Sequence, residues 1–233
     1  MRVKILILLF DVKKIIKIFC FSLCIYLTSC IELIDDITIN SDGSGKLKYS
    51  INLSSSKTEC NSLILLDSLN GYKVPKIEHL KAKIVQFEKL ISLQPGISQV
   101  QIESNWQDFI FKFSCDFDNL HNLQTAVKVT LKLLELPIGQ NFETDWIYLK
   151  ESCLIRDVPH IILNNFSEFK FIRQEELELS RYTSITRFDR EISYFENISA
   201  RLSQNKKAVM IQTDLKNLID NSKKLNNKIC ISN

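Results

Sequence analysis

Two runs of alternating apolar and polar residues near the start of the chain constrain its fold more than any other feature. The apolar members are Ile37, Ile39, Leu47, Tyr49, Ile51 and Leu53. Between the runs lies the turn sequence Ser41-Asp42-Gly43-Ser44-Gly45. A period of two places alternate side chains on one face of a sheet, and an Asp-Gly turn between two such runs is typical of a hairpin. The sequence therefore predicts an antiparallel β-hairpin with one buried face.

A second hairpin is predicted further along, with one strand over 97–102, a turn near 105–108 and an aromatic second strand. The residues that share one face of that second strand are Phe109, Phe111, Phe113, Cys115 and Phe117. Further strands are expected at 146–149, 153–155, 169–172, 181–188, 207–213 and 228–232. So many short runs without regular strand-helix alternation favour a mostly antiparallel sheet.

Two helices are predicted from apolar residues spaced three and four apart. The first stripe runs from Ile77 to Ile91, between Pro75 and Pro95-Gly96, and the second runs from Leu120 to Leu134 with Asp118 as its expected cap. Short helices are expected at 58–70 and 215–220. The fold class predicted is α+β, a mostly antiparallel sheet with hairpins covered on one face by two amphipathic helices. Residues 30–233 are expected to form a single domain.

The first thirty residues have the pattern of an export signal. Five basic residues precede and border a ten-residue apolar run at 18–27, which ends in Leu27-Thr28-Ser29-Cys30. This ending resembles the lipobox of bacterial lipoproteins. The resemblance implies that residues 1–29 form a signal peptide that is removed, and that the Cys30 thiol carries the lipid that attaches the protein to a membrane. An uncleaved membrane helix is disfavoured, because spanning a bilayer takes about 20 apolar residues.

The start and the end of the mature chain are similar to uncharacterised Bacteroidetes outer-membrane lipoproteins. The similarity lies in the opening IELIDDITINSDGSGKLKYSINL and in the closing region that includes Phe188-Asp189-Arg190, KKAV at 206–209 and KICIS. Ile31 follows the lipid-bearing cysteine where an aspartate would favour retention in the inner membrane. The resemblance therefore implies the outer membrane, with the periplasmic or surface side left open.

The charge of the mature chain excludes nucleic acid as a partner. The whole chain has a formal net charge of +3, but residues 1–29 contain five basic residues and one acidic residue. The remainder holds 25 basic and 26 acidic residues, which gives no basic surface for a phosphate backbone.

No motif for catalysis, a cofactor or a metal is found, so we expect a protein that is not an enzyme. The chain has only five glycines and lacks the glycine-rich loops that hold nucleotides. His79, His121 and His160 lie far apart without the spacing of a zinc site. A calcium loop around Gly43 fails, because Thr38 and Tyr49 stand where carboxylates are needed.

Four cysteines follow the lipid-bearing one and are candidates for disulfides. They are Cys60, Cys115, Cys153 and Cys230. Four cysteines in an exported chain permit two disulfides in three connectivities. The alternative is that they are small buried apolar side chains, as their apolar neighbours around Cys115 and Cys230 suggest.

The aromatic face formed by Phe109, Phe111, Phe113 and Phe117 leaves two functions open. If it packs fully against the helices, the domain is a lipid-anchored, non-enzymatic binding or envelope-assembly module for an envelope protein. If the helices stand away from the sheet, the same residues line a pocket for a lipid or other apolar ligand. A continuous apolar cavity would favour this second function, that of a carrier.

Overall fold

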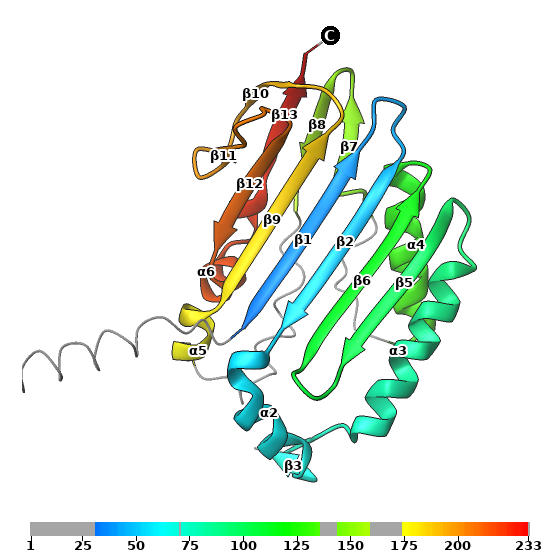
Figure 1. Cartoon of the computed structure of the whole chain (residues 1–233), viewed down its shortest axis with the longest axis vertical. Helices are drawn as coiled ribbons and strands as arrows, with labels where there is room; N and C mark the ends of the chain where they lie inside the picture. The colour runs from blue at the N-terminus through cyan, green and yellow to red at the C-terminus, as the bar shows by residue number, and fades with distance from the viewer. Residues whose placement is uncertain (1–30, 70, 136–143, 159–173, 233) are drawn as a thin grey trace, which may run out of the picture.

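A seven-stranded sheet forms the body of the protein in the computed structural model, which describes residues 31–69, 71–135, 144–158 and 174–232 (Figure 1). The strand order is β11-β12-β9-β1-β2-β6-β5. The strands are β1 (Glu32–Ile39), β2 (Gly45–Asn52), β5 (Ile97–Asn105), β6 (Ile110–Phe117), β9 (Arg181–Phe188), β11 (Arg201–Leu202) and β12 (Ala208–Thr213). With the helices below, this confirms the α+β class.

Most neighbouring strands of the large sheet are antiparallel, as the alternating patterns predicted. The first hairpin pairs Ile37 with Leu47, and β6 pairs with both β2 and β5. The exception is the central pair of β1 and β9, which run parallel with Glu32 opposite Arg181. Local alternation cannot reveal this pairing, because it joins segments almost 150 residues apart.

A second sheet holds part of the C-terminal half of the chain and was not predicted as a separate sheet. Its order is β10-β13-β8-β7, formed by β10 (Ile192–Phe195), β13 (Asn227–Ile231), β8 (Cys153–Arg156) and β7 (Ile147–Lys150). A disulfide between Cys153 and Cys230 joins β8 to β13. The strand expected at 169–172 lies outside the described residues.

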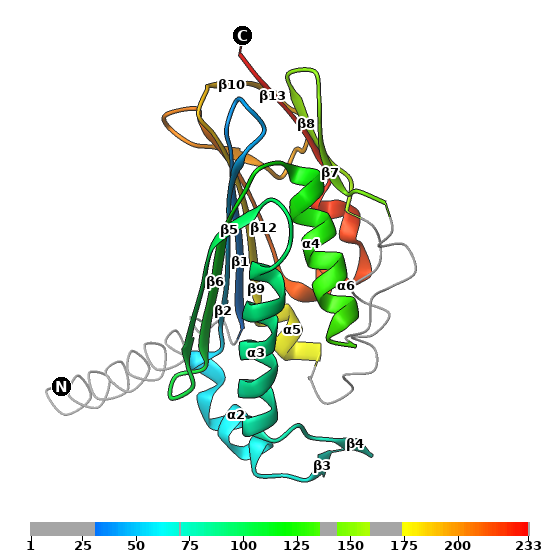
Figure 2. The same cartoon turned by 90° about the vertical axis from the view of Figure 1, so that its right-hand side faces the viewer.

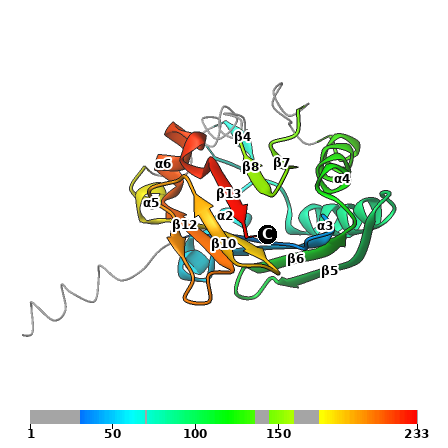
Figure 3. The ribbon, with the colours of Figure 1, turned by 90° about the horizontal axis from the view of Figure 1, so that it is seen from above.

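The helices and the second sheet lie on the same side of the large sheet (Figure 2). The helices are α2 (Lys57–Ile64), α3 (Ile77–Ser92), α4 (Leu120–Leu133), α5 (Gln174–Leu179) and α6 (Leu215–Asp220), with short 3-10 turns at Ser54–Ser56 and Ser222–Leu225. The view from above shows α3 and α4 over β5 and β6 (Figure 3). Two amphipathic helices on one face agree with the prediction.

The helix expected at 58–70 is shorter in the structure. α2 ends at Ile64, and a small hairpin of β3 (Ser68–Leu69) and β4 (Tyr72–Lys73) follows. Gly71 has a φ of 85°, a left-handed conformation that suits glycine at this tight turn. The first strand of this hairpin therefore occupies the end of the region that the apolar pattern assigned to one helix.

One apolar core connects both sheets with α3 and α4. It includes Ile39 from β1, Ile91 from α3, Leu123 from α4, Leu154 from β8 and Val209 from β12, all buried. The inward residues of β1 follow the predicted period of two, with Ile37 and Ile39 in this core. Within the described residues, no helix is both long and apolar enough to span a membrane.

The cap of α4 differs from the prediction by one residue. Asn119, not Asp118, is the cap, because the Asn119 side-chain oxygen accepts a hydrogen bond from the Asn122 backbone N–H at 2.8 Å. Asp118 instead accepts a bond from the Asn122 side-chain amide at 3.0 Å. The prediction was wrong because asparagine and aspartate are both good caps, and the sequence alone does not show which of the two residues stands at the helix boundary.

Replacing the cap should destabilise the protein measurably. We expect Asn119→Ala to lower the free energy of unfolding by about 1 kcal/mol, because a backbone N–H of the first turn then loses its partner. Asp118→Ala is the matched control and should have a smaller effect. Urea denaturation followed by circular dichroism checks both variants, and a larger loss for Asp118→Ala would contradict the assignment.

Candidate functional site

An apolar pocket lies between the helix-covered face of the large sheet and the helices α2 and α3. Its volume is about 540 Å³, within the range of roughly 300–1,000 Å³ that small-molecule sites occupy. Apolar side chains dominate its walls and include Leu63 and Ile64 of α2, Ile84 and Phe87 of α3, and Phe111 and Phe113 of β6. We call this cavity the apolar pocket.

The period-two pattern of β6 explains which aromatic residues reach the pocket. Phe111 and Phe113 line it, together with Phe109 from the turn before the strand. Phe117 shares their face, but it is 3% exposed and belongs to the core. The difference arises along the strand, because the Phe117 end packs beneath the start of α4 while the Phe111 end faces α2 and α3. The predicted group of four therefore divides into three pocket residues and one core residue.

Aromatic contacts hold the walls of the pocket in place. The Phe87 ring on α3 meets the Phe113 ring on β6 edge to face, with the ring centres 5.4 Å apart. Trp106, in the turn between β5 and β6, meets Phe111 in the same way at 4.9 Å. Each such pair contributes about 0.5–1.5 kcal/mol beyond the area that it buries. These contacts fix α3 and the turn relative to the sheet on two sides of the cavity.

The polar groups of the pocket are few and lie at separate places. Lys83 lines the pocket and donates from its Nζ to the Leu134 carbonyl oxygen at 2.9 Å. The Nζ of Lys81 lies 5.7 Å from the centre of the Trp106 ring, a cation–π contact. Cys60 also lines the pocket, and burial raises the pKa of its thiol, which favours the neutral form. Lys112 is also among the lining residues, although its Nζ pairs with Glu103 on the other face of the sheet.

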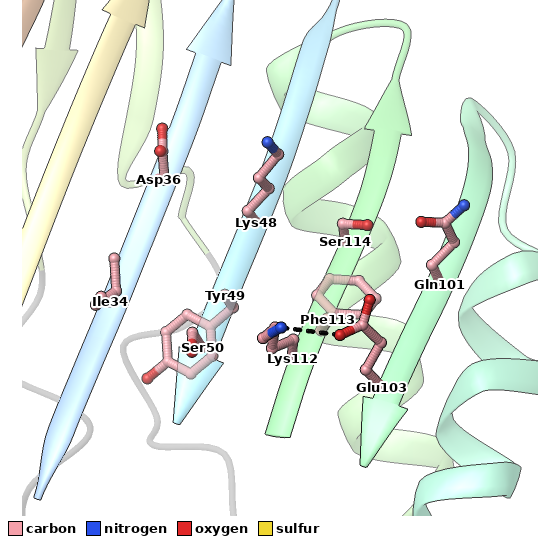
Figure 4. Close-up of a pocket in the computed structure, with 10 residues that line it drawn as sticks. All are labelled: Ile34, Asp36, Lys48, Tyr49, Ser50, Gln101, Glu103, Lys112, Phe113 and Ser114. Atoms are coloured by element: carbon pink, nitrogen blue, oxygen red, sulfur yellow. Dashed lines mark hydrogen bonds and ion pairs between the residues drawn. The ribbon is translucent and has the colours of Figure 1, made fainter. Parts of the chain in front are cut away.

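Tyr49 forms the sheet-side end of the pocket. Burial, together with the nearby charge of Asp35, raises the pKa of Tyr49 to about 12, so its hydroxyl is neutral at physiological pH. The side chain extends from β2 with its hydroxyl toward β1 (Figure 4). Asp35 is the cross-strand partner of Tyr49 on β1. The pocket therefore ends beside a buried carboxylate.

That carboxylate belongs to a buried polar cluster between the two sheets. Asp35 Oδ2 accepts hydrogen bonds from Arg156 Nη2, at 2.7 Å, and from the Tyr182 hydroxyl, while Arg156 Nη1 donates to Ser184 Oγ. Burial alone would raise the pKa of Asp35, but the Arg156 charge and the hydrogen bonds hold it below its usual range. The pair links β1 of the large sheet to β8 of the small one, which indicates a structural role.

The opposite, uncovered face of the large sheet carries a shallow groove of about 360 Å³ (Figure 4). Opposite charges pair on this face: Lys112 Nζ lies 2.9 Å from Glu103 Oε2, and Arg187 Nε lies 2.8 Å from Asp36 Oδ1. Surface pairs of this kind are common and contribute little to stability. The groove is a polar, partly exposed sheet face and is less suited than the apolar pocket to enclose a ligand.

The structure separates the candidate cysteines and histidines. Cys153 and Cys230 form the disulfide, whereas Cys60 and Cys115 carry free thiols. His121 Nδ1 lies 2.7 Å from Asp145 Oδ2, and His79 lies on α3. Across the described ranges, no three His, Cys, Asp or Glu side chains are grouped to hold a metal ion. The lipobox residues Leu27, Thr28, Ser29 and Cys30, and also His160, lie outside the described residues.

Sequence reasoning missed the residues of α2 and of the hairpin turn. Leu63 and Ile64 begin the apolar run LILL, and Trp106 is one of only two tryptophans in the chain. This run of four apolar residues, at the end of a short, polar helix and just beyond it, was an available signal of an apolar surface. The Asp35–Arg156 pair had no such signal, because its partners are 121 residues apart.

Comparison with known proteins does not place the chain in a family. No family model matches it, and no curated protein matches it. Among solved structures, it is similar to the NMR structure of the folded domain of LppM from Mycobacterium tuberculosis, with a TM-score of 0.36 and 10% sequence identity. That similarity covers 87% of this chain and 90% of the LppM domain. A similarity of this size supports no functional inference, so the site itself must carry the proposal.

Proposed function

We propose that this chain is a lipid-anchored, non-enzymatic envelope protein that binds an apolar or amphiphilic ligand in the apolar pocket. The observation that carries the proposal is the cavity of about 540 Å³ between the large sheet, α2 and α3. Helices packed tightly on the sheet would leave no such space. Between the two functions that the sequence left open, the cavity therefore favours the ligand carrier over the assembly module.

The chemistry of the pocket fits a ligand with an apolar chain and one polar end. The walls are aliphatic and aromatic, so a hydrocarbon gains free energy when it leaves water for this space. Lys83 and Tyr49 provide polar groups at separate points of the lining. A few polar groups in an apolar site fix the orientation of a ligand and add little to the area that it buries. A fatty acid or a single-chain lipid has this chemistry.

The lipid anchor is a separate part of the proposal. It rests on the sequence Leu27-Thr28-Ser29-Cys30 after a basic and apolar leader. Ile31 after Cys30 supports the outer membrane as the location. The Cys153–Cys230 disulfide also supports an envelope location, because such bonds persist in oxidising compartments. Intact mass of the protein from a membrane fraction, beside Cys30→Ser, tests the anchor directly.

Fluorescence quenching tests the pocket, because the two tryptophans lie in different places. Trp106 lines the apolar pocket, whereas Trp146 packs against the core with its ring 5.4 Å from Lys128 Nζ. A brominated fatty acid in the pocket should quench the emission of Trp106 by contact. We expect the Trp146→Phe variant to keep this quenching and the Trp106→Phe variant to lose most of it. Equal quenching in both variants, or none in either, would contradict the site.

A substitution that fills the cavity should block binding. Ile84 lines the pocket, and its neighbour Val85 is 65% exposed on another side of α3. We expect Ile84→Trp to weaken the binding of a fluorescent fatty acid about tenfold or more, equivalent to about 1.4 kcal/mol. Val85→Trp adds the same indole outside the cavity and should leave the affinity unchanged. Thermal unfolding of both variants controls for damage to the fold.

A further inference from the structure

Several elements of the fold meet at one end of the large sheet. The strand register places Glu32 beside both Asn52 and Arg181, and Asn52 beside Ile110. Ile110 in turn lies opposite Asn105, so the β5–β6 turn is at this end too. We call this the proximal end; it is the lower end in Figure 1, where α2 and α5 also lie.

Ile31, the residue after the cysteine proposed to carry the lipid, lies at the proximal end. Cys30 is bonded to Ile31, and consecutive Cα atoms are about 3.8 Å apart. Ile31 is fixed to the sheet, because its carbonyl oxygen accepts a hydrogen bond from the Arg181 backbone N–H at 2.7 Å. A lipid on Cys30 would therefore leave very little free chain between the membrane and the start of β1.

The apolar pocket belongs to the same end. Leu53, directly after β2, lines it, and so do Trp106 and Phe109 from the β5–β6 turn. Its outer wall is α2, which follows β2 through a single 3-10 turn. The pocket and the proposed anchor are thus neighbours at one end of the molecule, although they come from different segments of the chain.

Exposed leucines continue the wall of the pocket into solvent. Leu63 and Ile64 line the cavity, and the next two residues, Leu65 and Leu66, are 82% and 39% exposed. Ion pairs lie close to these leucines, with Lys76 bonded to Asp67 and Lys57 bonded to Asp108, so the neighbouring charges are largely balanced. Exposed apolar side chains that continue a buried apolar surface can enter the interfacial region of a bilayer, where their burial gains free energy.

We propose that the proximal end docks on the bilayer, with Leu65 and Leu66 inserted between the lipids and the apolar pocket next to the acyl chains. This inference rests on the proposed anchor and pocket. A short tether raises the effective concentration of the leucines at the membrane surface, so a weak insertion is sufficient. Docked in this way, a lipid chain passes between the bilayer and the pocket along Leu65, Leu66, Leu63 and Ile64, with little exposure to water.

Depth-dependent quenching tests the docking in the full, membrane-purified protein. Leu65→Cys and Leu93→Cys are each labelled with an environment-sensitive fluorophore in a Cys60→Ala background and reconstituted into vesicles of phosphatidylethanolamine and phosphatidylglycerol. Leu93 is the matched control, because it is 70% exposed and lies at the other end of α3 from the proximal end. Lipids with a spin label on the acyl chain should reduce emission from position 65 and leave emission from position 93 unchanged.

The outcomes separate this inference from the proposed function. Emission from position 65 that is insensitive to the spin-labelled lipid, or equal loss at both positions, would overturn the docking. Ligand binding is measured separately, through Trp106 in the Trp146→Phe protein with Cys60 in place, reconstituted in the same vesicles. Quenching of Trp106 without loss at position 65 would leave the pocket in place and remove the docking. Loss at position 65 without fatty-acid binding would support the docking and contradict the pocket.

Discussion

Replacing Asp35 with asparagine is expected to lower the free energy of unfolding by about 3–5 kcal/mol. The variant leaves the Arg156 guanidinium buried between the sheets without its counter-charge, and removal of one partner of a buried ion pair costs far more than the pair contributes. The Nη2 of Arg156 lies 2.7 Å from Asp35 Oδ2, and its Nε has no hydrogen-bond partner in the described part of the chain. The asparagine amide carries no charge, so little else near Arg156 would offset the charge of its buried guanidinium.

The adjacent residue provides the matched control. Asp36 pairs with Arg187 on the uncovered face of the sheet, with 2.8 Å between Asp36 Oδ1 and Arg187 Nε, and the Arg187 side chain is exposed. We expect Asp36→Asn to cost at most about 1 kcal/mol, because water compensates exposed partners. Urea denaturation at neutral pH compares the two variants. Equal losses would contradict the assignment of Asp35 to a buried, structurally required pair.

The pH dependence of stability provides a second test of the same pair. Burial raises the pKa of Asp35, but the Arg156 charge and the hydrogen bonds outweigh it, so the pKa in the folded protein is below the unfolded value. The stabilisation is therefore complete above the unfolded pKa of about 3.9 and is lost as the pH falls through the lower, folded value. We expect the wild type to lose stability in acid below about pH 4, and Asp35→Asn to show a smaller part of that loss.

Removal of the Cys153–Cys230 disulfide is expected to have the second-largest effect on stability, about 2–4 kcal/mol. The bond connects residues that are 77 positions apart and joins β8 to β13 in the small sheet. Without the bond, the conformational entropy of the unfolded chain increases, which favours unfolding. The small sheet is then held only by its hydrogen bonds and by packing against the core. The measurement is urea denaturation of the double variant Cys153→Ala/Cys230→Ala beside the wild type with and without reductant.

A free cysteine provides the control for this prediction. Cys60 is half-buried and has no disulfide partner, so Cys60→Ala should change stability only slightly and leave the effect of the reductant intact. The double variant should be insensitive to reductant. A wild type whose unfolding midpoint does not change when reductant is added would show that the bond does not form in solution.

Local periodicity explains which parts of the fold the sequence could predict. Alternation located β1, β2 and β6, and the three-and-four spacing located α3 and α4, because burial of one face leaves a repeating pattern along the element itself. The parallel pairing of β1 with β9 and the separate small sheet depend on contacts between distant segments. No single segment carries a signal for either of them.

The same distinction applies to the site. The sequence could assign Phe111, Phe113 and Phe117 to one face of a strand. It could not show that Phe117 belongs to the core and the other two to the pocket, because that difference depends on the position of α4. α2 forms the outer wall although its own sequence is polar and short. The cavity is lined by side chains from α2, α3 and the sheet, which only tertiary packing brings together.

Native mass spectrometry of the full protein, gently extracted from its membrane, tests the central claim most directly. We expect the wild type to carry the mass of a non-covalent lipid or fatty acid in addition to any acyl mass on Cys30. Ile84→Trp should lose this non-covalent mass, and Val85→Trp should retain it, because only the first indole occupies the apolar pocket. A wild type without bound apolar molecules, or the same occupancy in all three proteins, would contradict a ligand site between the sheet and the helices.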